Sequence, residues 1–263
     1  MYKYSDEISE VTLFACSQPI EGTIEGIENV QDLIAYCAKV SNPQFQLDFS
    51  KSEGLLKYLI KHKHFSPFEM VSATMEITTT RDIARQILRH RSFSFQEFSQ
   101  RYADVSSMED SFVLREARMQ DPKNRQNSIT CADKELQDWW EEAQLEVITL
   151  VQQKYQQALV KKIAKEQARS ILPEGNTVSR MYMQGSLRSW IHYCELRSAN
   201  GTQAEHMLIA KECAKAIVSI FPMITNKMET EVVSSEELTK LKEDSALLKT
   251  ISNSKYSGIK AGI

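Results

Sequence analysis

Residues 70–101 read MVSATMEITTTRDIARQILRHRSFSFQEFSQR, and within this run a strand pattern gives way to a helix pattern. Over residues 70–78 every second residue is apolar, which predicts a half-buried strand. The apolar positions are Val71, Ala73, Met75 and Ile77. Thr79 and Asp82 then have the spacing of a capping box, which predicts a helix that runs to about Arg89.

Three arginines lie on one face of this predicted helix. Arg81, Arg85 and Arg89 are four residues apart, so they stack along the helix surface and repel one another weakly. A bound phosphate or internal carboxylates could offset that repulsion. More polar side chains crowd the short loop that follows: His90, Arg91, Ser92, Ser94, Gln96, Glu97, Ser99 and Arg101. Because guanidinium groups suit phosphate, the cluster is typical of an anion cradle, and a solvated or carboxylate-paired surface is the alternative.

The rest of the chain contains few further strand patterns and many long helical ones. One more strand is predicted over residues 11–16. Helices are predicted over residues 29–41, 53–62 (capped by Ser52), 130–168 (opened by a Thr130/Asp133 capping box and stopped by Pro173), 185–197 and 203–220. This order of elements favours an α+β fold over alternating βαβ units.

The length and composition predict one domain with a tail. A chain of 263 residues can form a single large core, and 42% hydrophobic with 25% charged residues is typical of a globular protein. We predict one domain over residues 1–232. Beyond Val233 the sequence is rich in Ser, Lys and Glu, which predicts a docked or partly mobile polar tail over residues 233–263.

Charge and cysteine usage exclude several classes of function. The net charge of -3 gives no global attraction to nucleic acid or to a membrane surface, so any anion site has to be local. The chain has no run of about 18 apolar residues and no secretory signal pattern at its start. Its five cysteines are widely spaced and lack a C-x-x-C pair, which suggests reduced thiols rather than a disulfide frame or a zinc site. We expect a cytoplasmic protein, in the host cytoplasm if it is virus-encoded, with no metal, no nucleic acid and no membrane partner.

Four segments together resemble one enzyme family. Arg89-His90-Arg91, then seven residues, then Ser99, resembles the signature motif of the flavin-dependent thymidylate synthases, extended by Glu97, Arg101 and Tyr102. Residues 64–69 (HFSPFE), 168–173 (ARSILP) and 186–197 resemble three further segments of that family, in the same order. The resemblance covers roughly residues 10–225, and it implies a central, mostly antiparallel sheet flanked by long helices.

The resemblance also implies ligands and the residues that bind them. The cofactor is FAD, NADPH is the reductant, 5,10-methylenetetrahydrofolate is the carbon donor and dUMP is the substrate. Residues matched to cofactor binding are Ser66, Arg89, His90, Arg91, Glu97, Ser186, Leu187, Arg188 and His192, with His64 as a neighbour of the folate. Residues matched to dUMP binding are Gln86, Arg89, Glu97, Ser99, Gln100, Arg101, Arg169 and Arg197. The family's flavin sites lie between subunits, with Ser66 reaching the cofactor from a neighbouring subunit, which implies a homo-oligomer, specifically a tetramer.

Arg197 is matched to the activating role in catalysis. A fixed cation beside the uracil edge stabilises the anion that forms when N3 loses its proton, which makes C5 more reactive. None of the five cysteines is matched to a binding or catalytic role, which fits a route without a thiolate nucleophile. Ser99 fits a hydrogen-bond donor better than a nucleophile, because a serine nucleophile needs a base within reach. His64 could be a turn residue and His192 a core histidine.

Two departures from the family pattern affect the flavin contacts. Many family members have Asn where this chain has Gln96, and some have His within the stretch that here reads SANGTQ over residues 198–203.

Two other functions fit less well. A non-catalytic RNA- or nucleotide-binding protein could use segment 81–102, with aromatic side chains as stacking platforms among the arginines. Those aromatic residues are Phe93, Phe95, Phe98 and Tyr102. A nicotinamide dehydrogenase with its own dinucleotide fold is disfavoured, because the sequence has no G-x-G-x-x-G motif after a strand.

Overall fold

The computed structural model describes residues 2–3, 5–108 and 110–224. The tail predicted over residues 233–263 lies outside these residues. The chain divides into two compact units. Unit 1 contains residues 1–14, 74–184 and 199–210, and unit 2 contains residues 15–73, 185–198 and those from Lys211 onward.

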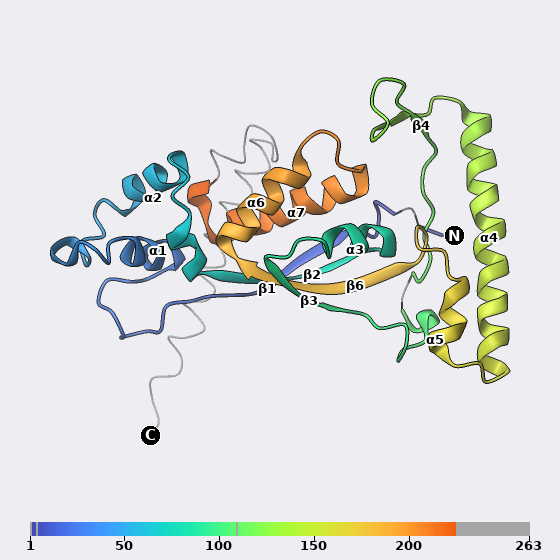
Figure 1. The fold of residues 1–263 in the computed structure, drawn as a ribbon, viewed down its shortest axis with the longest axis horizontal. Helices are drawn as coiled ribbons and strands as arrows, with labels where there is room; N and C mark the ends of the chain where they lie inside the picture. Colours follow the sequence, from blue (N-terminus) through green and yellow to red (C-terminus); the bar gives the residue numbers. More distant parts are fainter. Residues whose placement is uncertain (1, 4, 109, 225–263) are drawn as a thin grey trace, which may run out of the picture. The chain divides into compact units, whose positions relative to one another are not determined.

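A four-stranded sheet has the order β1-β2-β6-β3 (Figure 1). Its strands are β1 (Glu10–Cys16), β2 (Ser72–Thr80), β3 (Phe93–Glu97) and β6 (Val178–Ser186). The strands β2 and β6 run antiparallel, because residue numbers fall along one as they rise along the other: Leu187 N donates to Val71 O, and Arg81 N donates to Thr177 O. The predicted α+β class with an antiparallel sheet is confirmed.

The strand predicted over residues 70–78 is confirmed as β2, shifted by two residues. Its predicted apolar face is buried, since Val71, Ala73, Met75 and Ile77 are at most 2% exposed. The strand predicted over residues 11–16 is confirmed as β1. Two strands of this sheet have no matching prediction: β6, and β3, which occupies the segment expected to be a loop.

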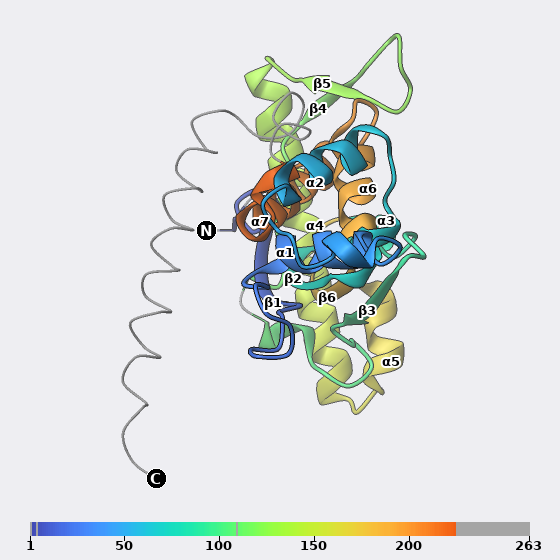
Figure 2. The same ribbon diagram turned by 90° about the vertical axis from the view of Figure 1, so that its left-hand side faces the viewer.

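Unit 1 contains a long helix and a small hairpin. The helices are α3 (Arg81–Ile87), α4 (Lys134–Val160), α5 (Lys165–Ala168) and the first turns of α7 (Ala204–Ile220), with short 3-10 turns at Val105–Ser107 (η3) and Arg169–Ile171 (η4). The strands β4 (Arg118–Gln120) and β5 (Ser128–Thr130) pair antiparallel and lie beside the first turns of α4 (Figure 2). One face of α4 packs on a core made by Val105, Phe112, Leu114, Ile148, Tyr155, Ala168 and Leu172.

Unit 2 is built mainly from helices. They are α1 (Val30–Ala38), α2 (Ser52–Lys61), α6 (Leu187–Ser198) and the part of α7 from Lys211 onward, with 3-10 turns at Pro43–Phe45 (η1), Ser66–Met70 (η2) and Pro222–Ile224 (η5). Helix α1 packs on α2 and on η2, and α6 also packs on η2. The indole of Trp190, which is fully buried, donates from Nε1 to Ala73 O at 3.1 Å.

The predicted capping residues are wrong at three helices, although the helices themselves form. Thr80 rather than Thr79 precedes α3, and its hydroxyl donates to Asp82 Oδ1 instead of capping the backbone. Asp133 rather than Thr130 caps α4, because its carboxylate accepts from the N–H groups of Glu135 and Leu136. Ser52 is the first residue of α2 and not its cap.

The long helical region ends earlier than predicted. Helix α4 stops at Val160, and Lys162 has a positive φ of 63° that no helix continues through. The chain then starts again as the short helix α5, which leads into η4. No helix in residues 2–3, 5–108 and 110–224 is long and apolar enough to cross a membrane.

Candidate active site

The first two arginines of the α3 face are paired with carboxylates. Arg81 is 6% exposed and lies 3.6 Å from Glu97 Oε1 and 3.3 Å from Glu174 Oε1. Arg85 lies 3.3 Å from Glu97 Oε2 and 3.7 Å from Glu174 Oε2. Two carboxylates therefore offset the repulsion between these two guanidinium groups. For Arg81 and Arg85 the carboxylate-paired alternative holds.

Arg89 and Arg91, in contrast, are exposed and are not paired with carboxylates among the described residues. Arg89 follows the end of α3, and Arg91 lies in the turn before β3; both are exposed. Neither forms an ion pair with any residue that the structure describes. Because α3 ends at Ile87, the predicted row of three arginines on one helix is shortened to two. Arg89 and Arg91 thus offer positive charge that the described protein does not neutralise.

Glu97 is held on all sides by unit 1. Its Oε1 accepts from the hydroxyl of Ser179 at 2.8 Å, and its other partners are the two paired arginines of α3. The side chain is 15% exposed. Glu97 thereby joins β3 to β6 and to α3, which fixes the strand that follows the Arg89-His90-Arg91 turn.

The turn after β3 lies against α5. Arg101 forms an ion pair with Glu166 at 3.3 Å, and Lys165 Nζ donates to the carbonyl of Tyr102 at 2.9 Å. These contacts bring the predicted Ser99, Gln100 and Arg101 near the segment that carries Arg169, the first residue of η4. The residues predicted to bind the nucleotide, 99–101 and 169, therefore lie in the same part of unit 1.

Gln100 has an unusual environment. It is only 3% exposed, yet its amide nitrogen has no hydrogen-bond partner among the described residues. A buried amide donor without a partner costs about 1–3 kcal/mol. Such a donor is suited to a polar ligand that approaches the turn.

The amide of Gln86 is held at both ends by α7 and the residue before it. Its Nε2 donates to Gln203 Oε1 at 2.8 Å, and its Oε1 lies 3.1 Å from Nδ1 of His206. Gln203 also lines a cavity of about 540 Å³ between the β4–β5 hairpin and α4. The ring of His206 stands nearly perpendicular to that of His90, with 6.5 Å between centroids.

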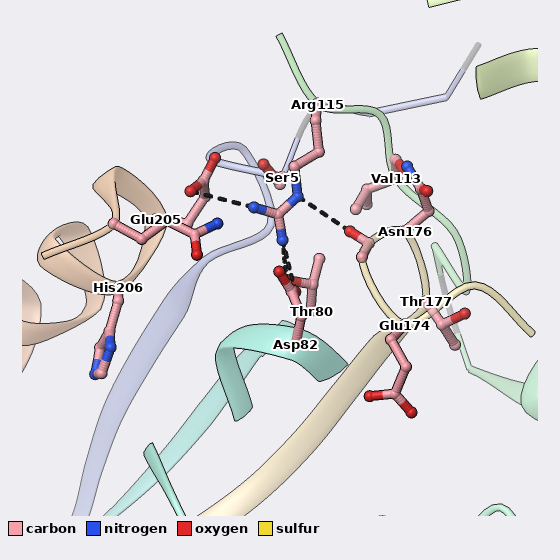
Figure 3. Close-up of polar contacts among 12 residues, drawn as sticks. Ser5, Thr80, Asp82, Val113, Arg115, Glu174, Asn176, Thr177, Glu205 and His206 are labelled. Carbon is pink, nitrogen blue, oxygen red and sulfur yellow. Dashed lines mark hydrogen bonds and ion pairs between the residues drawn. The ribbon is translucent and has the colours of Figure 1, made fainter. Parts of the chain in front are cut away.

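A buried ionic network that the sequence did not reveal holds the start of α7 (Figure 3). Arg115 donates to Thr80 Oγ1 at 2.6 Å, to Asp82 Oδ1 at 2.7 Å and to the carbonyl of Gly175 at 3.0 Å. It also lies 3.1 Å from Glu205 Oε2, and Glu205 Oε1 accepts from Arg118. These partners are far apart in sequence, so no local pattern could indicate the network.

The charge of Glu205 depends on its arginines. Burial on its own would raise the pKa of this carboxyl, but the attraction of Arg115 and Arg118, together with hydrogen bonds from the backbone and from Gln203, holds the pKa below its ordinary value. At 3% exposed, the carboxylate is anionic because two guanidinium groups face it.

Unit 2 carries the remaining predicted residues. Ser186 Oγ accepts from Ser189 N at 3.3 Å and so caps α6. Arg188 pairs with Glu69 at 2.9 Å, which joins α6 to η2, the turn that begins at Ser66. In the described residues, His64, Ser66 and His192 are exposed, Leu187 is buried, and Arg197 lies in the last turn of α6. His192 is therefore not a core histidine.

The cysteines in the described residues are all free thiols. Cys194 and Cys213 are fully buried, and burial raises the pKa of both thiols, so neither forms a thiolate at neutral pH. Among the residues that the structure covers, no group of three or more His, Cys, Asp and Glu could hold a metal ion.

Comparison with known proteins assigns the family. Residues 24–223 match the family model described as thymidylate synthase complementing protein. The chain belongs to this family. Members with curated names include a probable flavin-dependent thymidylate synthase of Paramecium bursaria Chlorella virus 1, 46% identical over 217 residues, which are 82% of this chain and 97% of the viral protein. The flavin-dependent thymidylate synthase of Synechocystis is 51% identical over 200 residues, which are 76% of this chain and 89% of that protein.

A solved structure shares the fold of this chain. A UMP/dUMP methylase, PolB from Streptomyces cacaoi, bound with 5-Br dUMP, superposes with a TM-score of 0.72 at 24% identity and covers 88% of this chain and 98% of its own. At that identity the likeness concerns the fold alone.

Proposed function

We propose that this chain is a flavin-dependent thymidylate synthase, which methylates dUMP reductively to dTMP. The main support for the proposal is that only some of the arginines in and after α3 are paired with carboxylates. Arg81 and Arg85 are neutralised by Glu97 and Glu174, whereas Arg89 and Arg91, inside the family's signature motif, have no ion-pair partner among the described residues. The names of the viral and cyanobacterial relatives support the same reaction.

The residues present fit a bound FAD. Two exposed guanidinium groups with no internal carboxylate suit its phosphates, and His90 lies between them in sequence. Further proposed contacts are Ser66, Glu97, Ser186, Leu187, Arg188 and His192. When bound, FAD supplies the hydride that completes the methyl group, with NADPH as the proposed reductant and 5,10-methylenetetrahydrofolate as the carbon donor near His64.

The proposed dUMP site lies at the turn after β3. Ser99 and Arg101 would hold the phosphate, and the buried amide nitrogen of Gln100 supports a ligand here because it has no hydrogen-bond partner in the described residues. Gln86, Arg89, Glu97 and Arg169 are the other proposed nucleotide residues. Arg101 would exchange its exposed ion pair with Glu166 for the phosphate, at low cost because exposed pairs contribute at most about 1 kcal/mol.

Arg197 is the proposed catalytic residue. Its guanidinium would stabilise the negative charge on the uracil as N3 loses its proton, which raises the reactivity of C5. The buried, protonated thiols of Cys194 and Cys213 support a route in which no cysteine attacks the ring. We further propose a homotetramer with active sites between subunits and a cytoplasmic location.

The decisive experiment measures tritium release from [5-³H]dUMP together with dTMP formation, with and without methylenetetrahydrofolate and NADPH. We expect dTMP only when both are present, from a yellow protein with oxidised-flavin absorbance. A colourless protein that binds RNA and forms no dTMP would contradict the proposal. Burial removes one of the four aromatic residues of that alternative, since Phe93 is 9% exposed, whereas Tyr102 is 78% exposed and still open to a base, so the experiment decides between the two functions.

A further inference from the structure

His206 is a polar side chain at a fully buried position. It lies in the first turn of α7 and is 0% exposed. A buried imidazole is tolerated when its ring nitrogens form hydrogen bonds. One of them does so with a predicted nucleotide residue, because Nδ1 lies 3.1 Å from Gln86 Oε1.

The contacts of Gln86 fix the direction of its amide. Its nitrogen donates to Gln203 Oε1, so its oxygen is the end that faces His206. An amide oxygen can only accept, and therefore Nδ1 of His206 carries the hydrogen and donates. An amide nitrogen has two hydrogens and an amide oxygen has two lone pairs, so one of each remains available on Gln86 for a ligand.

The first turn of α7 is itself held in place. Glu205, the residue before His206, is fixed by Arg115 and Arg118, and Figure 3 shows the two neighbouring side chains leaving the same turn. His206 also lies near the ring of His90, with 6.5 Å between centroids and 89° between planes. The imidazole is therefore close to both Gln86 and a residue of the signature motif.

We propose that His206 is a positioning residue that sets the Gln86 amide for binding the nucleotide. This inference rests on the proposed function, in which Gln86 contacts dUMP. Without the Nδ1 donor, Gln86 Oε1 would lose a hydrogen bond in a partly buried place, and the amide could rotate away from its binding orientation. His206 acts before the chemistry, so the effect falls on nucleotide affinity and not on turnover.

The test compares two substitutions at this position by the Kd and KM for dUMP and by kcat. His206→Leu removes the donor, and we expect dUMP to bind about tenfold more weakly with kcat within about threefold, because the Gln86 amide is no longer held in its binding orientation. His206→Asn places an amide N–H near the position of Nδ1, and we expect it to restore affinity to within about threefold. Cys213→Ala, at another buried position of α7, is the matched control and leaves the affinity unchanged.

A double-mutant cycle with Gln86→Ala separates positioning from a merely structural role. If His206 acts through Gln86, adding His206→Leu to Gln86→Ala weakens dUMP binding no further. Additive effects, an unchanged affinity in His206→Leu, or an Asn variant as weak as the Leu variant would each overturn the proposal. Should His206→Leu not fold, His206→Ala removes the same donor with a smaller side chain, and unchanged affinity there would overturn the proposal equally.

The outcome also distinguishes this inference from the proposed function. Wild-type protein that binds dUMP and forms dTMP, while Gln86→Ala binds dUMP normally, would overturn the positioning role alone. Wild-type protein that binds no dUMP would overturn both.

Discussion

Arginines at equal spacing in the sequence differ in burial and in ion pairing in the structure. Arg81 is buried against Glu97 and Glu174, whereas Arg89 is exposed beyond the helix end without an ion pair in the described residues. The periodicity predicted that the arginines share a face, and it left open whether phosphate or carboxylates balance them. The answer depends on Glu174, which is distant in sequence, and no local pattern contains that information.

Substituting one arginine of each kind separates stability from cofactor binding. We expect Arg81→Ala to lower the free energy of unfolding by about 2 kcal/mol, because Glu97 loses a charged partner in a mostly buried place. We expect Arg89→Ala to leave the melting temperature of the flavin-free protein nearly unchanged and to weaken FAD binding about tenfold or more. Thermal unfolding and flavin content measure the two effects, and a reversed pattern would refute the assignment.

Arg197→Ala tests the catalytic role. We expect the yellow cofactor to remain bound and dTMP formation to fall about 10²- to 10³-fold, because one charge-stabilising donor is lost. Arg188→Ala is the matched comparison on the same helix, since it removes a guanidinium paired with Glu69 and would weaken cofactor binding instead. Unaltered turnover in Arg197→Ala would remove this residue from the mechanism.

Arg101 and Glu166 form an ion pair, and only Arg101 is proposed to bind the dUMP phosphate. We expect Arg101→Ala to raise the KM for dUMP with flavin retained. Glu166→Gln breaks the same ion pair but keeps the arginine, and we expect dUMP to bind equally well or more tightly. If both variants weaken dUMP binding alike, the pair is structural and the phosphate assignment fails.

Elements were predicted more reliably than their ends. The apolar repeats of β2, α1, α2, α6 and α7 are local, so the sequence reveals them. The strand β6 was missed because its buried face includes the polar Ser179, which is explained only by its bond to Glu97. At α4 the predicted cap was wrong because Thr130 and Asp133 both offer a side-chain acceptor near the helix start, and the backbone turn decides between them.

Helix α4 offers a direct comparison between the true and the expected cap. We expect Asp133→Ala to lower the free energy of unfolding by about 1 kcal/mol, because two backbone N–H groups lose their acceptor. This corresponds to a fall of about 2–4 °C in Tm. Thr130→Ala, at the exposed end of β5, serves as control and shifts Tm much less. Equal shifts would contradict the observed cap.

At the scale of the whole molecule, the site depends on contacts between distant segments. The family motifs in the sequence indicated Gln86, residues 99–101 and Arg169, and the structure holds the latter two together through Glu166 and Lys165. Neither Arg115 nor His206 was predicted. Their partners lie tens of residues away, and an isolated arginine or histidine carries no pattern of its own.

The Arg115–Glu205 network makes stability depend on pH. The pKa of Glu205 is lowered in the folded protein, so its contribution is fully present above the unfolded value of about 4.5 and is lost as pH falls through the folded value. We expect Glu205→Gln to cost on the order of 3 kcal/mol at neutral pH, because two buried guanidinium groups lose their shared anion.

The comparison of unfolding free energies across pH checks this. The difference between wild type and Glu205→Gln should stay constant above about pH 5 and shrink below pH 4.5. Glu53→Gln, which removes an exposed ion pair within α2, is the control and should show almost no difference at neutral pH. A wild-type advantage that persists unchanged at pH 3 would exclude Glu205 as its source.

The bond between Gln86 and His206 joins positions 120 residues apart. During translation, helix α3, which carries Gln86, leaves the ribosome long before His206 has been synthesised. A nascent chain arrested between these two points would already display Arg89 and Arg91, yet Gln86 would still rotate freely. The proposed nucleotide site would therefore be completed late in synthesis, with the opening turn of α7.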